Sequence, residues 1–253
     1  MTQTKPAHTD LSIDEMPWPE FIDPPPTDLP YDDGEPMESP WHAARGPLLK
    51  ASYVARHGGR MTDYYVGVNM FVYYSWQQVR NKDYKGPDLY FVKNVDGTRD
   101  RLYWAIWNEA GRYLDVIIEL LSTTTEREDL GPKKRLYEQV FRTTEYFCVA
   151  PQVERLLGGR LTNGHYKAIK PDLHGRLWSQ ELDLWLGPWR GVYLGEKHTW
   201  LRFYTNDGAL VSLPEEAKRA RAETERQRAD DLATRLAILE DELRGLRGEE
   251  TQP

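Results

Sequence analysis

Two acidic residues stand inside segments whose other side chains are mostly apolar and β-forming. Asp88 opens the run DLYFV after a Gly-Pro turn, and Glu119 lies within VIIELL. A carboxylate in a buried strand is costly unless it is paired, protonated or bound to a cation. If the two strands pair, both carboxylates reach one end of a sheet, where their oxygens suit magnesium or manganese rather than zinc. The residues alone leave open that these acids cap strand edges or pair with arginine.

The surrounding pattern predicts an α/β or α+β core with a mixed central β-sheet flanked by helices. A helix is expected at 42–57, shortened or kinked at Gly46-Pro47. Another is expected at 131–141, with a proline near its start and one apolar face made by Leu136, Tyr137, Val140 and Phe141. Core strands are expected within 64–75, 86–95, 113–122 and 145–151. An extra hairpin is expected at 156–169, around Asn163-Gly164, and further β structure at 177–189 and at 199–211, the latter turning at 206–208.

Composition divides the chain into three predicted parts. Residues 1–30 form an acidic, proline-rich arm with weak order, residues 31–213 a folded domain, and residues 214–253 a C-terminal helix. Residues 1–40 carry one lysine against ten acids, whereas residues 41–213 carry 24 basic and 19 acidic residues. A mildly basic middle is compatible with binding a polyanion, and an uneven spread of surface charge explains it equally well.

The C-terminal helix carries a narrow leucine seam. Leucines recur at spacings of 4, 3, 4 and 3, flanked by arginine and glutamate, at Leu232, Leu236, Leu239, Leu243 and Leu246. A helix packing on its own domain needs a wider apolar stripe, so this seam favours a short parallel coiled coil between copies of the chain. We therefore expect a homodimer or higher homo-oligomer. The alternative is a frayed, solvated helix.

Basic residues follow the strand of Glu119. The helix at 131–141 presents Lys133 and Lys134, and one of them can fold back to hold an attacking water or steady a phosphate oxygen. The alternative for Lys133 is a solvated side chain in a first helical turn. Asp115 lies four residues before Glu119 on the same strand face, as an extra ligand or, more simply, a strand-start residue.

These segments together resemble a known family. In the order YDDGEPMESPWH, YYVGVNMFVYYS, GPDLYFV, DVIIELLS, DLGPKKRLY and EYF, residues 30–205 are similar to the Uma-type restriction endonuclease family of the PD-(D/E)XK nuclease superfamily. The resemblance implies a restriction-endonuclease-like core. It also implies that Asp88, Glu119 and the backbone carbonyl of Leu120 bind a divalent metal, Mg²⁺ or Mn²⁺.

One departure from the superfamily pattern is important. Two residues after Glu119 stands Leu121 instead of lysine. The family pattern D-x-x-x-K-x-x-x-Y fits Asp129, Lys133 and Tyr137, which makes Lys133 the candidate active-site lysine and Lys134 the second choice. Near the first helix, the resemblance also implies accessory roles for Glu38 and His42. Their alternatives are a turn residue and a helix-start hydrogen bonder.

The resulting expectation is a metal-dependent endonuclease that hydrolyses phosphodiester bonds of nucleic acid, DNA before RNA. Asp88 and Glu119 hold the metal, and Lys133 positions water and offsets charge on phosphate oxygens. The alternative is a catalytically inactive nuclease-fold protein that binds nucleic acid or another partner, and the missing in-register lysine motivates it.

Other classes of protein lack support in the sequence. The single cysteine, Cys148, excludes an internal disulfide, and its apolar setting EYFCVAP indicates a buried thiol. No apolar run approaches the roughly 20 residues of a membrane helix, and no secretory signal is recognisable, so we expect a cytoplasmic protein without membrane contact. No P-loop or nucleophile-elbow motif occurs, and the pairs Gly58-Gly59 and Gly158-Gly159 are expected in turns.

Overall fold

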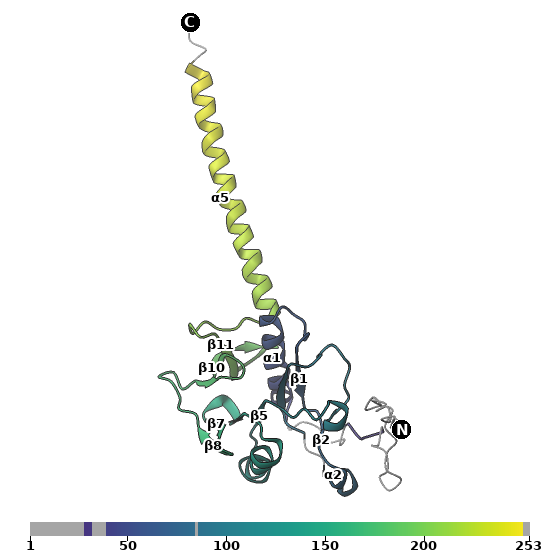
Figure 1. Ribbon diagram of the computed structural model, residues 1–253. Helices are drawn as coiled ribbons and strands as arrows, with labels where there is room; N and C mark the ends of the chain where they lie inside the picture. The colour runs from purple at the N-terminus through teal and green to yellow at the C-terminus, as the bar shows by residue number, and fades with distance from the viewer. Residues whose placement is uncertain (1–27, 32–38, 84–85, 250–253) are drawn as a thin grey trace, which may run out of the picture.

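A six-stranded mixed sheet lies at the centre of the protein. The computed structural model describes residues 28–31, 39–83 and 86–249, and Figure 1 shows a rounded body from which one long helix projects. The strand order is β1 (Tyr64–Val68), β3 (Leu89–Lys93), β5 (Val116–Leu120), β6 (Glu145–Val149), β7 (Leu156–Thr162) and β8 (His165–Ala168). Within this sheet β5 and β6 run parallel, and the other neighbouring strands pair antiparallel. The predicted mixed sheet is confirmed, as is the hairpin at Asn163-Gly164 that joins β7 to β8.

Both faces of this sheet are buried. Side chains such as Val66, Phe91 and Ile118 face helix α1 (Pro40–Arg56) and a second, antiparallel sheet. That sheet has the order β11 (Glu196–Tyr204), β10 (Leu184–Tyr193), β9 (Leu177–Ser179). The alternate side chains, including Tyr90 and Ile117, face a helical segment at 126–141 and Trp104. Because successive strand residues point to opposite faces, β5 is apolar on both sides apart from Glu119.

Smaller elements complete the body. The short strands β2 (Val72–Tyr73) and β4 (Trp104–Ala105) pair in parallel, helix α2 (Trp76–Asn81) follows β2, and the 3₁₀ turns η2 (Ile106–Asn108) and η5 (Pro151–Val153) follow β4 and β6. A core strand within 64–75 is confirmed as β1, but the segment holds a second, separate strand, β2, that was not predicted. Asn69 has φ 48°, which breaks the extended backbone and separates β1 from β2.

Helix α1 runs through a proline. The Ser39 hydroxyl caps it by accepting a hydrogen bond from the His42 backbone N–H at 3.1 Å. The expected shortening at Gly46-Pro47 does not occur, because burial of Leu48 and Leu49 offsets the lost backbone hydrogen bond. A Cβ at Gly46 would lie 2.7 Å from Val68 Cγ1 and 3.6 Å from the Asp88 carbonyl oxygen. Glycine therefore allows α1 to pack closely against the Val68 side chain at the end of β1.

The helical segment after β5 starts earlier than predicted. It is continuous from Glu126 to Phe141, through α3 (Glu126–Glu128), the π-helical turn η3 (Asp129–Lys133), α4 (Lys134–Leu136) and a second π-helical turn, η4 (Tyr137–Phe141). Pro132 lies inside η3 and not at a helix start, because the wider turn tolerates the missing N–H. Of the predicted apolar face, Tyr137 and Phe141 are buried, whereas Val140 is exposed.

Two glycine pairs differ in their setting. Gly58 and Gly59 follow α1 in a turn with φ 80°, as expected. Gly158 and Gly159 are not turn residues, because they lie inside β7. A Cβ on Gly159 would lie 3.0 Å from the side chain of Tyr166 on β8, so the missing side chain lets that ring lie across β7.

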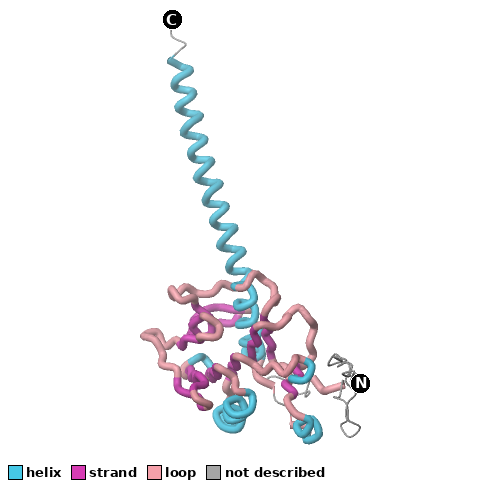
Figure 2. The backbone as a smooth tube through the Cα atoms, viewed as in Figure 1, coloured by secondary structure: helices cyan, strands magenta, loops and turns pink. Residues whose placement is uncertain are grey.

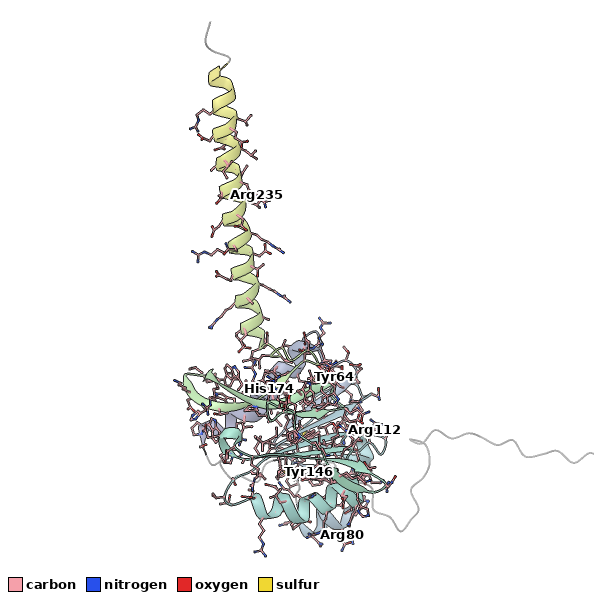
Figure 3. All side chains as sticks on the ribbon, turned by 90° about the vertical axis from the view of Figure 1, so that its left-hand side faces the viewer. Tyr64, Arg80, Arg112, Tyr146, His174 and Arg235 are labelled. Carbon is pink, nitrogen blue, oxygen red and sulfur yellow. The ribbon has the colours of Figure 1, made fainter. Side chains whose placement is uncertain are left out.

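The long helix α5 (Pro214–Glu249) leaves the body and contacts it only near its first turn in the views of Figures 1 and 2. Glu216 fixes this turn: it pairs with the buried Arg202 at 2.8 Å and accepts a hydrogen bond from the Leu213 N–H at 2.8 Å. Figure 3 shows side chains radiating into solvent around Arg235. Among the described residues, no helix combines the length and apolarity needed to cross a membrane.

Candidate active site

Asp88 and Glu119 meet at one end of the central sheet. Leu89 of β3 pairs with Ile118 of β5 in an antiparallel register. Asp88, just before Leu89, therefore lies opposite Glu119, just after Ile118. The Asp88 N–H donates to Glu119 Oε2 at 3.2 Å, and the Leu120 N–H donates to Asp88 Oδ2 at 2.7 Å. A backbone N–H of each segment thus holds the carboxylate of the other segment in place. The two carboxylates lie close together, as expected from the pairing of the two strands that carry them.

The helical segment supplies a lysine to the same point. Lys133 Nζ lies 3.3 Å from Glu119 Oε1 and 2.9 Å from Asp129 Oδ1. The Tyr137 hydroxyl donates to Glu119 Oε1 at 2.9 Å. Asp129, Lys133 and Tyr137 are spaced by four residues, so they share the helix face that packs over β5. Lys134, the second candidate, is exposed, and the ion pairs with Glu119 and Asp129 are made by Lys133.

Burial determines the electrostatics of this group. Glu119 is fully buried, and the Lys133 side chain is only 15% exposed. Burial raises the pKa of Glu119 well above its usual value, and the negative charges of Asp88 and Asp129 raise it further against the opposing effect of Lys133. For Lys133, burial lowers the pKa, but Glu119, Asp129 and Asp88 together raise it above its usual range. Lys133 therefore remains a cation at any physiological pH.

The site fits a divalent cation by its donor chemistry. Three carboxyl groups surround one ammonium group in a largely buried place, so a further positive charge offsets an excess of negative charge. Carboxylate oxygens are the ligands that Mg²⁺ and Mn²⁺ prefer, and Mg²⁺ commonly uses only one or two protein carboxylates besides water. Within the part of the chain that the structure describes, no group of three or more His, Cys, Asp or Glu side chains is arranged as a metal cage.

Other predicted residues lie elsewhere. Asp115 precedes β5 at its opposite end, where its carboxylate accepts a hydrogen bond from the Lys93 N–H at 2.7 Å and lies 3.4 Å from Arg112. Its interpretation as an extra ligand is therefore wrong, and it is a strand-start residue. His42 lies in the first turn of α1, and its accessory role stays a prediction. Glu38 falls outside the described residues.

The chain is similar to a known protein family. A family model described as "Uma2: Putative restriction endonuclease" matches residues 14–191, which is more than half of the chain. The chain belongs to the Uma2 family. Asp88, Glu119, Lys133 and Tyr137 all lie within the matched range, and helix α5 lies beyond it. The family assignment places the chain among nuclease-type proteins.

Two solved chains are similar to this one. One of them is described as a putative nuclease belonging to DUF820 from Anabaena variabilis, with 14% sequence identity and a TM-score of 0.39. The similarity covers 60% of this chain and 81% of that chain. No curated protein matches the chain.

Arg45 was missed by the sequence patterns. It lies on α1, is 2% exposed, and its Nη2 donates to the carbonyl oxygens of Val149 and Ala150 at 3.3 Å each. Its Nη1 is buried without a hydrogen-bond partner. Burial lowers the pKa of Arg45 to about 10, and the nearby charges of Asp88 and Glu154 oppose that shift. The available signal was an arginine three and four residues before the buried leucines of one helix face.

The contact of Asp129 with Lys133 at the site was also not predicted. Asp129 was noted only as the first position of the family pattern, yet it is 1% exposed and holds Lys133 against Glu119. The Tyr146 hydroxyl donates to its backbone carbonyl at 2.8 Å. The backbone of Asp129 thus connects the helical segment to β6, and its carboxylate orients the Lys133 ammonium group.

Proposed function

We propose that this Uma2-family protein is a metal-dependent endonuclease that hydrolyses phosphodiester bonds of DNA. The observation that carries the proposal is the meeting of Asp88 and Glu119 under the Lys133 ammonium group, within a chain of this family. Asp88, Glu119 and the Leu120 backbone carbonyl would hold Mg²⁺ or Mn²⁺. When bound, the ion would polarise the scissile phosphate and lower the pKa of the attacking water.

The protein's own groups have separate roles in this mechanism. Lys133 carries a permanent positive charge, so it does not remove a proton; it positions the water and offsets negative charge on the phosphate oxygens. Tyr137 and the Asp88 N–H each hold one oxygen of Glu119, which fixes the carboxylate plane. The water oxygen forms a bond to phosphorus and loses a proton to bulk water, while the bond from phosphorus to the leaving sugar oxygen breaks and that oxygen takes up a proton from bulk water.

The test of this function is cleavage of plasmid DNA by the purified chain with Mg²⁺ or Mn²⁺ and with EDTA. Nicking that requires the metal supports the proposal, and parallel reactions with single-stranded DNA and RNA define the substrate class. The rival possibility, an inactive nuclease fold, started from the absence of an in-register lysine. Lys133 reaches Glu119 from the helical segment, and this ammonium group at the site supports the enzyme over the inactive fold. Lack of cleavage of every nucleic acid, together with no Mn²⁺ binding by calorimetry, would leave only the rival.

We further propose that two copies associate through α5 as a parallel coiled coil. Four of the seam leucines have described side chains, and all four are exposed in the single chain: Leu232 and Leu236 by 59%, Leu243 by 55% and Leu239 by 54%. In a parallel pair, Arg235 of one helix would face Glu240 of the other, so this flanking pair attracts. Such pairing places two active sites on one assembly, which suits cutting both strands of a duplex.

This association has a direct test. Replacing Leu236 and Leu239 by Asp is expected to halve the mass measured by light scattering, to the 29.5 kDa of one chain, because two charges would face each other in the apolar seam. Ile238→Asp is the matched control, since Ile238 is 54% exposed but lies outside the seam and should leave the mass unchanged. A wild-type chain that is already a monomer, or a double variant of undiminished mass, contradicts the coiled coil.

A further inference from the structure

An open groove of about 450 Å³ runs beside the candidate active site. Leu130 and Lys134 of the helical segment form one wall, β6 and β7 form the floor, and Tyr166 with the residues after β8 forms the other wall. Its volume falls within the usual range of small-ligand sites. The groove is not assigned any role by the mechanism above.

The groove shares its walls with the carboxylate site. Leu130 and Lys134 directly follow Asp129 and Lys133, and Cys148 on the floor pairs in register with Glu119. Tyr146, which Figure 3 labels in the lower part of the body, lies in the floor and donates to the Asp129 carbonyl. A chain whose phosphate reaches Lys133 would therefore pass its next nucleotide into the groove.

The lining selects for a flat, apolar group attached to a polyanion. Tyr146 and Tyr166 are stacked with ring centroids 5.8 Å apart, and Leu157 on β7 is 41% exposed. The exposed Lys134 on the helical segment is the lysine that lines the groove beside these apolar surfaces. Aromatic and apolar walls next to a positive charge are the combination that binds unpaired bases and their phosphates.

We propose that this groove binds an unpaired nucleotide next to the scissile phosphate, so that the preferred substrate is nucleic acid with a single-stranded segment at the cut. The inference rests on the proposed nuclease function. A paired base hides its faces in the stack and offers only its edges, which proteins read mostly by hydrogen bonds. An unpaired base offers its whole apolar face to the hydrocarbon and aromatic side chains of the groove.

The test measures binding separately from cleavage. Fluorescence anisotropy in EDTA, at one fixed ionic strength, compares a labelled oligothymidine of about 15 nucleotides with a blunt duplex hairpin of equal nucleotide number. The protein carries Glu119→Gln so that no substrate is cut. We expect the single strand to bind about tenfold more tightly than the duplex. Equal or tighter binding of the duplex overturns the proposal.

Variants then locate the binding. Leu157→Glu places a negative charge in the groove and is expected to weaken single-strand binding about tenfold; Lys134→Ala, at an exposed position that tolerates change, is expected to weaken it severalfold. Leu194→Glu is the matched control, because Leu194 is 75% exposed in the turn between β10 and β11. Circular dichroism checks that each variant is folded.

Two results would contradict the groove. Folded Leu157→Glu and Lys134→Ala proteins that bind the single strand like the control show that the nucleotide lies elsewhere. A change of mass in Leu157→Glu by light scattering shows that the groove is instead a contact between copies. Failure of the nuclease proposal appears in a different measurement, as absence of metal-dependent cleavage by the wild-type chain.

Discussion

Glu119→Gln is expected to lower metal-dependent DNA cleavage by a factor on the order of 10²–10³ or more. The amide has nearly the same shape as the carboxylate, so the Tyr137 hydroxyl can still donate to its oxygen. What is lost is the negative charge that would bind the divalent cation and pair with Lys133. The measurement is the initial rate of plasmid nicking in Mg²⁺ and in Mn²⁺.

A second buried strand glutamate provides the control. Glu145 of β6 is also fully buried, but it binds Arg160 at 2.8 Å and the Gln180 N–H at 2.9 Å, away from the candidate site. Glu145→Gln should lower the melting temperature and leave the cleavage rate within a few-fold when assayed well below that temperature. Retained cleavage in Glu119→Gln, or equal losses in the two variants, would show that Glu119 has no special chemical role.

Lys133→Met is expected to remove both activity and stability. The cleavage rate should fall on the order of 10²–10³ because the cation beside the phosphate is gone. The free energy of unfolding at neutral pH should fall by about 3–5 kcal/mol, since Glu119 and Asp129 lose the charge that pairs with them. Denaturant unfolding and nicking rates measure the two effects separately.

The pH dependence of Lys133→Met has a defined sign. Glu119 has a raised pKa in the folded protein, so the folded state binds its proton more tightly than the unfolded state, in which the pKa is near 4.5. This group therefore favours folding at low pH, and the advantage is lost as pH rises from about 4.5 toward the folded-state pKa. Without Lys133 that pKa is higher still, so the deficit of Lys133→Met relative to wild type should shrink on acidification.

A neighbouring lysine serves as the comparison. Lys134 is exposed, so Lys134→Met should change stability by less than about 0.5 kcal/mol at every pH. A Lys133→Met protein with unchanged stability, or a deficit that grows as pH falls, would mean that Lys133 does not neutralise the buried carboxylates. The comparison also separates the two lysines that the sequence presented as alternatives.

The acids in the strands were predictable because burial makes a lone carboxylate conspicuous. Strand pairing follows from the apolar runs, so the sequence was enough to expect Asp88 and Glu119 at one sheet end. Lys133 and Tyr137 came from a family pattern. Their convergence depends on the helical segment beginning at Glu126 and passing through two π-helical turns, which local propensity does not encode.

The misses have related physical causes. Pro132 was taken as a helix start because proline is usually excluded from helix interiors, and the π-helical turn removes that conflict. Asp115 shares the strand face of Glu119, but four residues of extended chain carry it to the opposite end of β5. Arg45 comes from α1, far from the strands in sequence, and only tertiary packing brings it near Asp88.

The most direct test is anomalous diffraction from crystals soaked in Mn²⁺. We predict one strong peak bound by an oxygen of Asp88 and an oxygen of Glu119, with Lys133 beside it, and its disappearance in Glu119→Gln crystals. A fully soaked crystal with no peak between these carboxylates, or with manganese bound only elsewhere on the chain, would contradict a metal-dependent nuclease site at this end of the sheet.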